Sequence, residues 1–205
     1  MNKAIILCID LDDTLSLTAD TILEFAINFD KTKLNRSGIL KQIDNCEDYY
    51  YFARMLEWNR EQLISFFDTC YLDYLQKIKV KPDASLIINK IKNLGIEIYI
   101  VTSRRERENN EIKIITQEWL KQNSIVYDKL FLNVINKGEL IKEINPTYFV
   151  DDSYKNCLDV TKVCKDTKTF LIETNFNNKI QTENVLKVKN LKELYEFIKG
   201  DVRNE

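Results

Sequence analysis

The feature that most constrains the fold of this 205-residue chain is an apolar run, residues 5–9, that leads directly into Asp10, Asp12 and Asp13. An unbroken apolar run rich in Ile is typical of a strand that is buried on both faces in a parallel sheet. Such sheets bind ligands at the carboxyl ends of their strands, where these acids lie. The three carboxylates repel one another, and a bound Mg²⁺ or Ca²⁺ ion would relieve that repulsion better than Zn²⁺. The alternative interpretation is a solvated acidic turn after a core strand.

The chain contains no histidine, and this absence narrows the possible chemistry. It excludes histidine phosphatases, Ser-His-Asp and Cys-His hydrolases, and metal sites with histidine ligands. None of the five cysteines has an arginine six positions later, so a tyrosine-phosphatase loop is absent, and no Gly-x4-Gly-Lys-Ser/Thr loop occurs. A hydrolase with this sequence therefore depends on carboxylates and a metal.

Bulk composition favours a globular protein with one domain, or with one core and a modest insert. Hydrophobic residues make up 44% of the chain and charged residues 30%, and the net charge of −2 does not suggest nucleic acid as an obligate partner. The apolar runs are far shorter than a membrane span, and the run that follows Lys3 ends at Asp10 without a cleavage-like segment. We therefore expect a cytoplasmic protein with no membrane partner.

The five scattered cysteines support neither a disulfide framework nor a zinc site.

Hydrophobic periodicity separates a helical segment from the rest of the chain. Helical patterns cover residues 17–29, 47–57 and 60–78, with a break at 35–38. Pro82 is suited to open the next helix as its first residue. The sequence therefore predicts a helical insert over residues 16–81, placed after the first strand, and a core domain made of residues 1–15 and 82–205.

After Pro82 the chain alternates between helix and strand. Helices are predicted over residues 83–94, 105–123, 138–144, 153–164 and 190–199, and strands over 96–101, 130–134, 147–150, 168–172 and 185–188. Gly95 is a suitable helix stop, and the polar tail 200–205 is expected to fray. Alternation of this kind predicts an α/β fold with a Rossmann-like parallel sheet and right-handed crossovers.

Four short segments resemble the motifs of the haloacid dehalogenase-like (HAD) superfamily, and they occur in the same order. Residues 10–14 (Asp-Leu-Asp-Asp-Thr) resemble the first motif, and the strand that ends in Thr102 resembles the second. Lys137 can serve as the lysine of the third motif, and a strand that ends in Asp151 and Asp152 resembles the fourth. The resemblance implies a HAD-like core, and the insert after the first motif implies a mobile helical cap over the active site.

The resemblance also implies a mechanism of phosphoryl transfer. Asp10 is the expected nucleophile, which would form an aspartyl-phosphate. Asp12 is the expected general acid, which would protonate the leaving group and then take a proton from water. A Mg²⁺ cofactor would be held by the Asp10 carboxylate, the Asp12 backbone carbonyl and Asp151, with Asp152 acting through water or as a brace. The alternative for the Asp151–Asp152 pair is a helix N-cap.

Candidate substrate-binding residues come from the second and third motifs. The hydroxyl of Thr102 would bind a phosphate oxygen, with help from backbone N–H groups at the following helix, and Ser103 lies beside it. Arg104 is the best of three nearby arginines for a contact with substrate, the others being Arg105 and Arg107. The alternative is that all three belong to a charged helix face. Lys137 would offset the charge of Asp10 and of the phosphate, with Lys142 as the alternative lysine.

The insert bears on the choice of phosphate ester. It is rich in aromatic residues, which either pack in its own core or reach the active site and stack on a nucleobase. Segments 102–106, 116–120, 127–128 and 137–152 also resemble the bacterial branch related to the 5′(3′)-deoxyribonucleotidases. We therefore expect a nucleoside monophosphatase of the 5′-nucleotidase type. The alternatives are a phosphatase for small sugar or organic phosphates, a 3′-phosphatase for nucleic-acid ends, and a non-catalytic module that binds a nucleotide. The sequence leaves the oligomeric state open.

Overall fold

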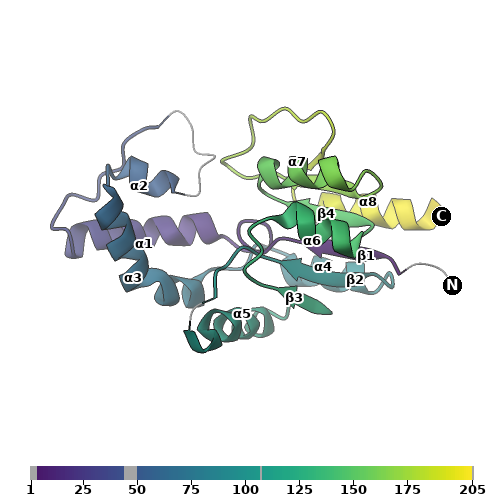
Figure 1. Cartoon of the computed structure of the whole chain (residues 1–205), viewed down its shortest axis with the longest axis horizontal. Coiled ribbons are helices and arrows are strands. Elements are labelled where there is room, and N and C mark those ends of the chain that lie inside the picture. The colour runs from purple at the N-terminus through teal and green to yellow at the C-terminus, as the bar shows by residue number, and fades with distance from the viewer. Residues whose placement is uncertain (1–3, 44–49, 107, 205) are drawn as a thin grey trace. The chain divides into compact units, whose positions relative to one another are not determined.

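A computed structural model describes residues 4–43, 50–106 and 108–204 of the chain (Figure 1). The chain divides into two compact units. One unit comprises Met1–Ser16 together with Val80–Glu205, and the other comprises Leu17–Lys79. The second unit is inserted after the first strand of the first one. Among the described residues, no helix is both long enough and apolar enough to cross a membrane.

The larger unit is built on a six-stranded parallel sheet with the strand order β3-β2-β1-β4-β5-β6. The strands are β1 (Ile6–Ile9), β2 (Glu97–Val101), β3 (Lys129–Phe131), β4 (Tyr148–Asp151), β5 (Lys168–Ile172) and β6 (Leu186–Val188). The central strands β1, β2 and β4 are almost entirely buried, and for β1 its unbroken apolar sequence predicted this. Ile9 pairs with Ile100 on one side and with Val150 on the other. This register places the residues that follow β1, β2 and β4 next to one another.

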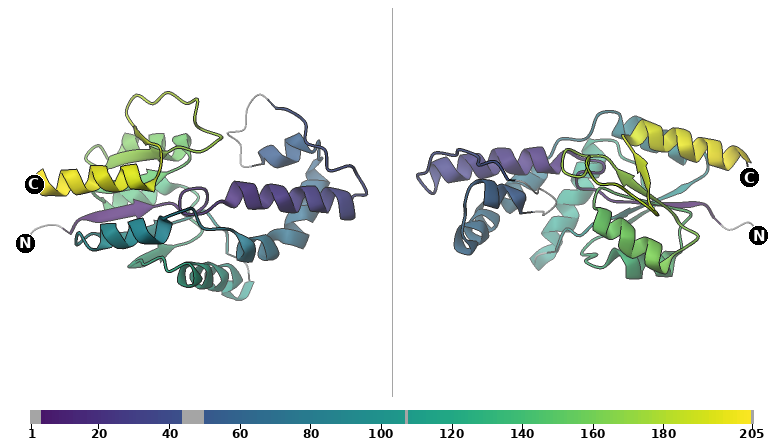
Figure 2. Two further views of the ribbon diagram at one scale, coloured as in Figure 1. Left: turned by 180° about the vertical axis from the view of Figure 1, so that it is seen from behind. Right: turned by 90° about the horizontal axis from the view of Figure 1, so that it is seen from above.

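Helices cover both faces of the sheet (Figure 2). They are α4 (Ala84–Lys92), α5 (Glu111–Gln122), α6 (Lys137–Ile144), α7 (Tyr154–Val163) and α8 (Leu191–Asn204). Helix α4 packs against α8, and α6 packs against α7. On the α6–α7 face, Ile141, Cys157 and Val160 form one hydrophobic cluster with Cys8 and Phe149 of the sheet. The predicted α/β class with a Rossmann-like parallel sheet is confirmed.

Several predicted boundaries in this unit are wrong. The polar tail does not fray after residue 199, because α8 continues to Asn204 and Asp201 accepts hydrogen bonds from Lys168 Nζ and Tyr148 Oη. Pro82 does not open α4, because Asp83 adopts a left-handed conformation (φ 61°) and the helix starts at Ala84. Helix α4 ends at Lys92 with Asn93 as its C-cap, earlier than the expected stop at Gly95, although Gly95 does adopt a positive φ of 83°.

The helix predicted from residue 105 begins later than expected. A short 3₁₀ turn, η1 (Glu108–Asn110), precedes α5, and Asn109 and Asn110 both have positive φ angles, which interrupt an α-helix. The carboxylate of Glu106 then accepts hydrogen bonds from the backbone N–H groups of Ile112 and Lys113 and so caps α5. Arg104 and Arg105 therefore precede the helix, and Arg107 lies outside the described residues. For Arg104 and Arg105, the charged-helix-face alternative is wrong.

The smaller unit is helical in its described part. It contains α1 (Thr18–Thr32), α2 (Tyr51–Met55) and α3 (Arg60–Lys77), and α1 contacts both of the others. Its core is an aromatic cluster centred on Phe66, whose ring lies 5.3–5.6 Å from the rings of Phe29, Phe52 and Trp58. Residues 47–49 of the predicted helix 47–57, and with them Tyr49, lie outside the described residues, as does Cys46.

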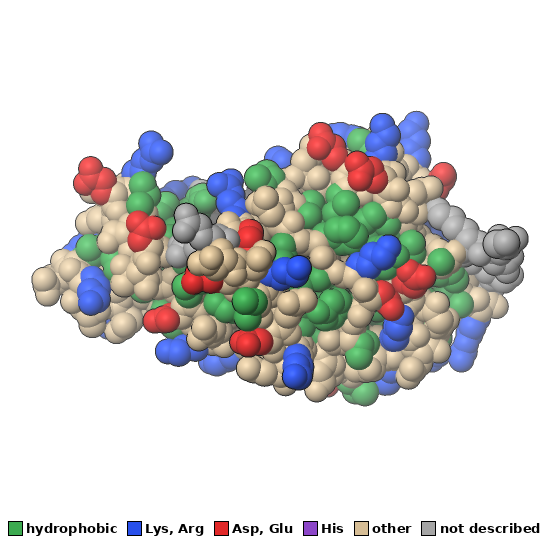
Figure 3. Space-filling model, turned by 60° about the horizontal axis from the view of Figure 1, so that its bottom comes forward, with side chains coloured by type: hydrophobic (Ala, Val, Ile, Leu, Met, Phe, Trp, Pro, Cys, Tyr) green, Lys and Arg blue, Asp and Glu red, His purple; other side chains and the backbone are tan. Residues whose placement is uncertain are grey.

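On the face shown in Figure 3, Lys and Arg side chains are interspersed with Asp and Glu. Charges of both signs are scattered there, and no stripe of one sign runs across this face. A protein that tracks a nucleic-acid backbone needs a basic stripe or patch. The face shown in Figure 3 has no such stripe.

Candidate active site

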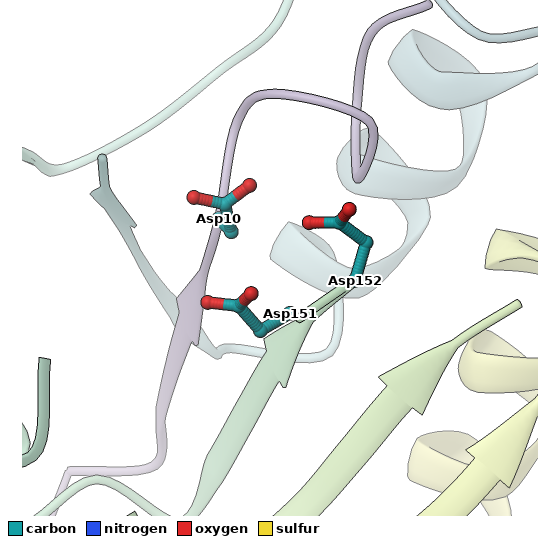
Figure 4. Close-up of side chains that lie close together, drawn as sticks. All are labelled: Asp10, Asp151 and Asp152. Atoms are coloured by element: carbon teal, nitrogen blue, oxygen red, sulfur yellow. The ribbon is translucent and has the colours of Figure 1, made fainter. Parts of the chain in front are cut away.

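Carboxylates from two neighbouring strands meet at the carboxyl edge of the sheet (Figure 4). Asp10 follows β1 and donates its backbone N–H to the carbonyl of Val150 over 2.9 Å, which ties it to β4. Asp151 is the last residue of β4, and Asp152 comes next. Asp10 and Asp151 are buried, with 5% and 1% of their surface exposed. The fold thus brings Asp10 together with Asp151 and Asp152, which lie about 140 residues further along the chain.

Lys137 bridges two of these acids. Its ammonium group donates to Asp10 Oδ1, and it also donates to Asp151 Oδ2 over 2.7 Å. The lysine is the first residue of α6, where Gly138 lets the helix approach α7 closely. A Cβ at Gly138 would lie 3.2 Å from the carbonyl oxygen of Asp159. The alternative lysine, Lys142, is exposed in the last turn of α6, so Lys137 is the lysine that the fold brings to Asp10.

The electrostatics of the site reflect an excess of negative charge. Burial, together with the charges of Asp151 and Asp12, raises the pKa of Asp10 to about 7, although Lys137 opposes the shift. Burial and the charges of Asp151 and Asp10 also raise the pKa of Asp152 well above its ordinary value. Burial alone would lower the pKa of Lys137, but the two carboxylates outweigh that effect and raise it. One lysine therefore does not balance the acids around it.

The same acids could hold a divalent cation. One carboxylate oxygen from each of Asp10, Asp151 and Asp152 can be chosen so that all three lie within 4.8 Å of one another. Oxygen donors with excess negative charge suit Mg²⁺, which binds through one or two carboxylates and retains several waters. The donor set therefore fits the expected cofactor. Asp152 belongs to this cluster, and whether it binds a metal directly, through water or acts as a brace stays a prediction.

Polar neighbours that were not predicted fix the orientation of the Asp151–Asp152 pair. Asp151 accepts hydrogen bonds from the backbone N–H of Ser153 (2.8 Å) and from Asn156 Nδ2 (3.1 and 3.2 Å). Asn177, in the loop after β5, donates from Nδ2 to the carbonyl of Asp152 over 2.8 Å. The N-cap of α7 is Ser153, so the N-cap alternative for the two acids is wrong. Such neighbours orient the ligands of a metal site.

Asp12 lies in a separate ion pair with Arg104. Arg104 Nε donates to Asp12 Oδ2 over 2.9 Å, and Nη2 donates to Oδ1 over 2.7 Å. Thr102, which follows β2 and is fully buried, donates from its hydroxyl to Asp12 Oδ2 over 3.4 Å. The sequence placed Arg104 near the site through its position after Thr102, but gave no sign that its partner would be Asp12.

The remaining candidates for substrate binding differ in their exposure. Ser103 and Arg105 are exposed, whereas Thr102 and Arg104 are buried. The hydroxyl of Thr102 also accepts a hydrogen bond from the backbone N–H of Arg104 over 3.3 Å. Contact of Thr102, Ser103, Arg104 and Lys137 with a phosphate ester stays a prediction.

Comparison with known proteins gives the class of this fold. No family model matches the chain. A candidate HAD hydrolase of Bacillus subtilis bound to magnesium superposes with a TM-score of 0.65 at 12% identity, covering 97% of this chain and all of that one. A HAD phosphatase of Thermococcus onnurineus superposes with a TM-score of 0.57 at 18% identity, covering 97% and 99%. The fold is that of the haloacid dehalogenase-like hydrolases, as the four motifs predicted.

The chain is also similar in sequence to a protein named as a nucleotidase. A nucleotidase of Clostridium acetobutylicum is 25% identical over 193 residues, which are 94% of this chain and 92% of that protein. The predicted resemblance is therefore confirmed: the chain is similar to HAD-like hydrolases in fold and to a nucleotidase in sequence.

Proposed function

We propose that this protein is a Mg²⁺-dependent phosphomonoester hydrolase that acts through an aspartyl-phosphate on Asp10. The observation that carries the proposal is the buried ion pair at the sheet edge, in which Lys137 bridges Asp10 and Asp151. A buried acid with a raised pKa beside a fixed cation is typical of a functional site. A purely structural ion pair would not need Asp152 as a third acid within 4.8 Å.

The chain's own residues account for both half-reactions. A carboxylate oxygen of Asp10 attacks phosphorus, the bond to the ester oxygen breaks, and that oxygen keeps the electron pair and takes a proton from Asp12. Asp12 then takes a proton from water as the water attacks the aspartyl-phosphate. The bond between Asp10 and phosphorus breaks, which releases inorganic phosphate and restores the Asp10 carboxylate. Lys137 would offset the charge that Asp10 and the phosphate bring together.

Mg²⁺ is the proposed cofactor, held by Asp10, Asp151 and the backbone carbonyl of Asp12, with Asp152 as a further carboxylate. When bound, the ion would neutralise phosphate charge and help align the phosphorus for attack. Asn156 and Asn177 would keep the acid pair in place during this chemistry, because both bond to it directly.

The proposed substrate is a nucleoside 5′-monophosphate, and the unit of residues 17–79 is proposed to act as a helical cap that selects it. The clostridial relative, named as a nucleotidase, supports this choice. Three rings of the insert, Phe52, Phe66 and Tyr74, are fully buried and have a packing role. Small sugar or organic phosphates remain the second candidate substrates. The mixed charges on the face shown in Figure 3 disfavour nucleic-acid ends as substrates. We also propose that the protein is located in the cytoplasm.

A substrate panel tests the proposal. The purified protein would be assayed for phosphate release from nucleoside 5′- and 3′-monophosphates, deoxynucleotides and sugar phosphates, with Mg²⁺ and with excess chelator. We expect Mg²⁺-dependent turnover that is fastest with a nucleoside 5′-monophosphate. Faster turnover of sugar phosphates would support the second candidate. A metal-loaded protein that hydrolyses no ester but binds a nucleotide would overturn the enzyme assignment in favour of the binding module.

A further inference from the structure

The Asp12 carboxylate is held by one buried arginine in a geometry that fixes its plane. Two parallel hydrogen bonds, from Arg104 Nε and Nη2, reach the two carboxylate oxygens over 2.9 and 2.7 Å. Pairs of this kind constrain orientation as well as distance. The Asp12 side chain keeps 24% of its surface exposed, whereas that of Arg104 keeps 3%. Asp12 is therefore bound on one side and open to solvent on the other.

Arg104 is itself fixed by three other segments of the larger unit. Its Nη1 donates to the hydroxyl of Thr116 in α5 over 3.2 Å. Its backbone N–H donates to the Thr102 hydroxyl over 3.3 Å, and its carbonyl accepts from the backbone N–H of Asn133, in the loop after β3, over 2.9 Å. The guanidinium is thus oriented by the protein alone, without a substrate.

The hydrogen bonds of Arg104 indicate that it acts through Asp12 and does not contact a phosphate directly. All three guanidinium nitrogens already donate within the protein, and the side chain is buried. Arg104 and the Thr102 hydroxyl bind the two Asp12 oxygens, and the side chain still keeps 24% of its surface exposed, where the carboxyl group can carry or accept a proton. The open side of Asp12 is where a leaving group or a water could exchange that proton.

We propose that Arg104 is a positioning residue, anchored by Thr116, that orients Asp12 for protonation of the leaving group. The inference rests on the proposed function, because it concerns the step in which the ester oxygen departs from phosphorus and takes its proton from Asp12. A misplaced acid cannot reach that oxygen, so departure would depend on the intrinsic stability of the leaving anion. A good leaving group, such as a dinitrophenolate, needs no proton, whereas the 5′-oxygen of a nucleoside does.

The test uses an Arg104→Lys variant, which keeps the positive charge and loses the bidentate geometry. We expect kcat/KM for a nucleoside 5′-monophosphate to fall on the order of 100-fold, and that for dinitrophenyl phosphate to change only about threefold or less. Competitive inhibition by orthovanadate, which reports phosphate-site binding, should be unchanged. Thr116→Val should cause a smaller loss with the same dependence on leaving group, and Lys121→Arg, an exposed substitution on α5, should match the wild type.

A double variant separates positioning from a general structural effect. In an Asp12→Asn background, Arg104→Lys should add little further loss, because the group that it orients is already absent. An equal loss for every ester, or weaker vanadate inhibition, would overturn the inference and assign Arg104 to substrate binding or to the fold. A wild-type protein inert on all esters would instead overturn the proposed function and this inference together. Thermal unfolding of each variant confirms that the proteins compared are folded.

Discussion

The carboxyl edge of the sheet and the aromatic cluster of the 17–79 unit are built on opposite principles. At the sheet edge, two buried carboxylates share one buried lysine, and a third acid lies close by. In the cluster, Phe66 is fully buried, and its ring packs against the rings of Phe29, Phe52 and Trp58. The first region concentrates like charges, which weaken a fold, and the second removes apolar surface from water, which stabilises it.

This difference separates residues that serve chemistry from residues that serve folding. Charges at the sheet edge are retained at a cost to stability, so removing the right acid should abolish activity and leave the fold intact. Rings in the cluster contribute packing, so removing one should destabilise the unit and leave the chemistry of the sheet edge unaltered. The following variants test that division, beginning with the largest expected effect.

Asp10→Asn should reduce phosphate release about 10⁴-fold or more, because an amide cannot form the acyl-phosphate. The free energy of unfolding should change by less than about 2 kcal/mol, since the amide oxygen still accepts from Lys137 and one repelled charge is gone. Activity and chemical denaturation, measured on the same preparation, check both parts. Unfolding of this variant under native conditions would mean that the sheet edge serves folding after all.

Lys137→Met should lose activity and also destabilise the larger unit by about 3–5 kcal/mol, because it leaves two buried carboxylates without their cation. Lys142→Met is the matched control on the same helix, and as an exposed substitution it should change stability by about 0.5 kcal/mol or less. Urea denaturation measures both. Equal effects of the two variants would contradict the assignment of Lys137 as the lysine that neutralises Asp10 and Asp151.

Phe66→Ala should cost about 3 kcal/mol, the usual penalty for a cavity in a packed core. Hydrogen exchange should rise in α1, α2 and α3 and remain unchanged in the sheet. Ile64→Ala, an exposed substitution on the same helix, is the matched control. If exchange rose equally at β1 and β4, the division between the two regions would be wrong.

Removal of Mg²⁺ should matter more at high pH than at low pH. The pKa of Asp10 is raised to about 7, above its value of about 4 in the unfolded chain. Its stabilising contribution is thus full below pH ~4 and is lost as the pH rises through 7, unless a cation replaces the proton. We expect saturating Mg²⁺ to add about 1–3 kcal/mol at pH 8 and clearly less at pH 5.5. Thermal scans with Mg²⁺ and with chelator would show this, and Asp10→Asn should abolish the difference.

The smallest effect concerns an ion pair near the end of α8. Partial burial would raise the pKa of Asp201, but hydrogen bonds from Lys168 and Tyr148 outweigh it and lower the pKa. A lowered pKa gives stability that is present above pH ~4 and is lost as the pH falls through the folded value. Asp201→Asn should therefore cost about 0.5–1 kcal/mol at pH 7, and the difference from wild type should shrink below pH 4. A constant difference across this range would contradict the contribution of the ion pair.

The parts of the structure that were predictable from sequence are those with short-range signals. The apolar strands and the acids after β1 and β4 could be found because each lies within one contiguous segment. The Asp12–Arg104 pair could not, since it joins residues 92 positions apart and any nearby carboxylate could have been the partner. Asn177 was missed because an asparagine in a loop is usually a turn residue.

Helix ends were also harder to predict than helices. The late start of α5 depends on Asn109 and Asn110 in left-handed conformations, and on Glu106 as the cap, which a periodic pattern does not reveal. The extension of α8 depends on contacts of Asp201 with β4 and β5, which are known only after folding. Local backbone conformation and capping decided the start of α5, and tertiary contacts decided the end of α8.

The most direct test of the central claim is chemical trapping of the aspartyl-phosphate. The enzyme would be mixed with substrate and Mg²⁺, quenched in acid and treated with borohydride, which reduces an acyl-phosphate to an alcohol, and its peptides would be analysed by mass spectrometry. We predict that Asp10 is converted to homoserine, only when substrate is present. Reduction at another residue, or turnover without any reducible acyl-phosphate, would contradict the role of Asp10 as the nucleophile.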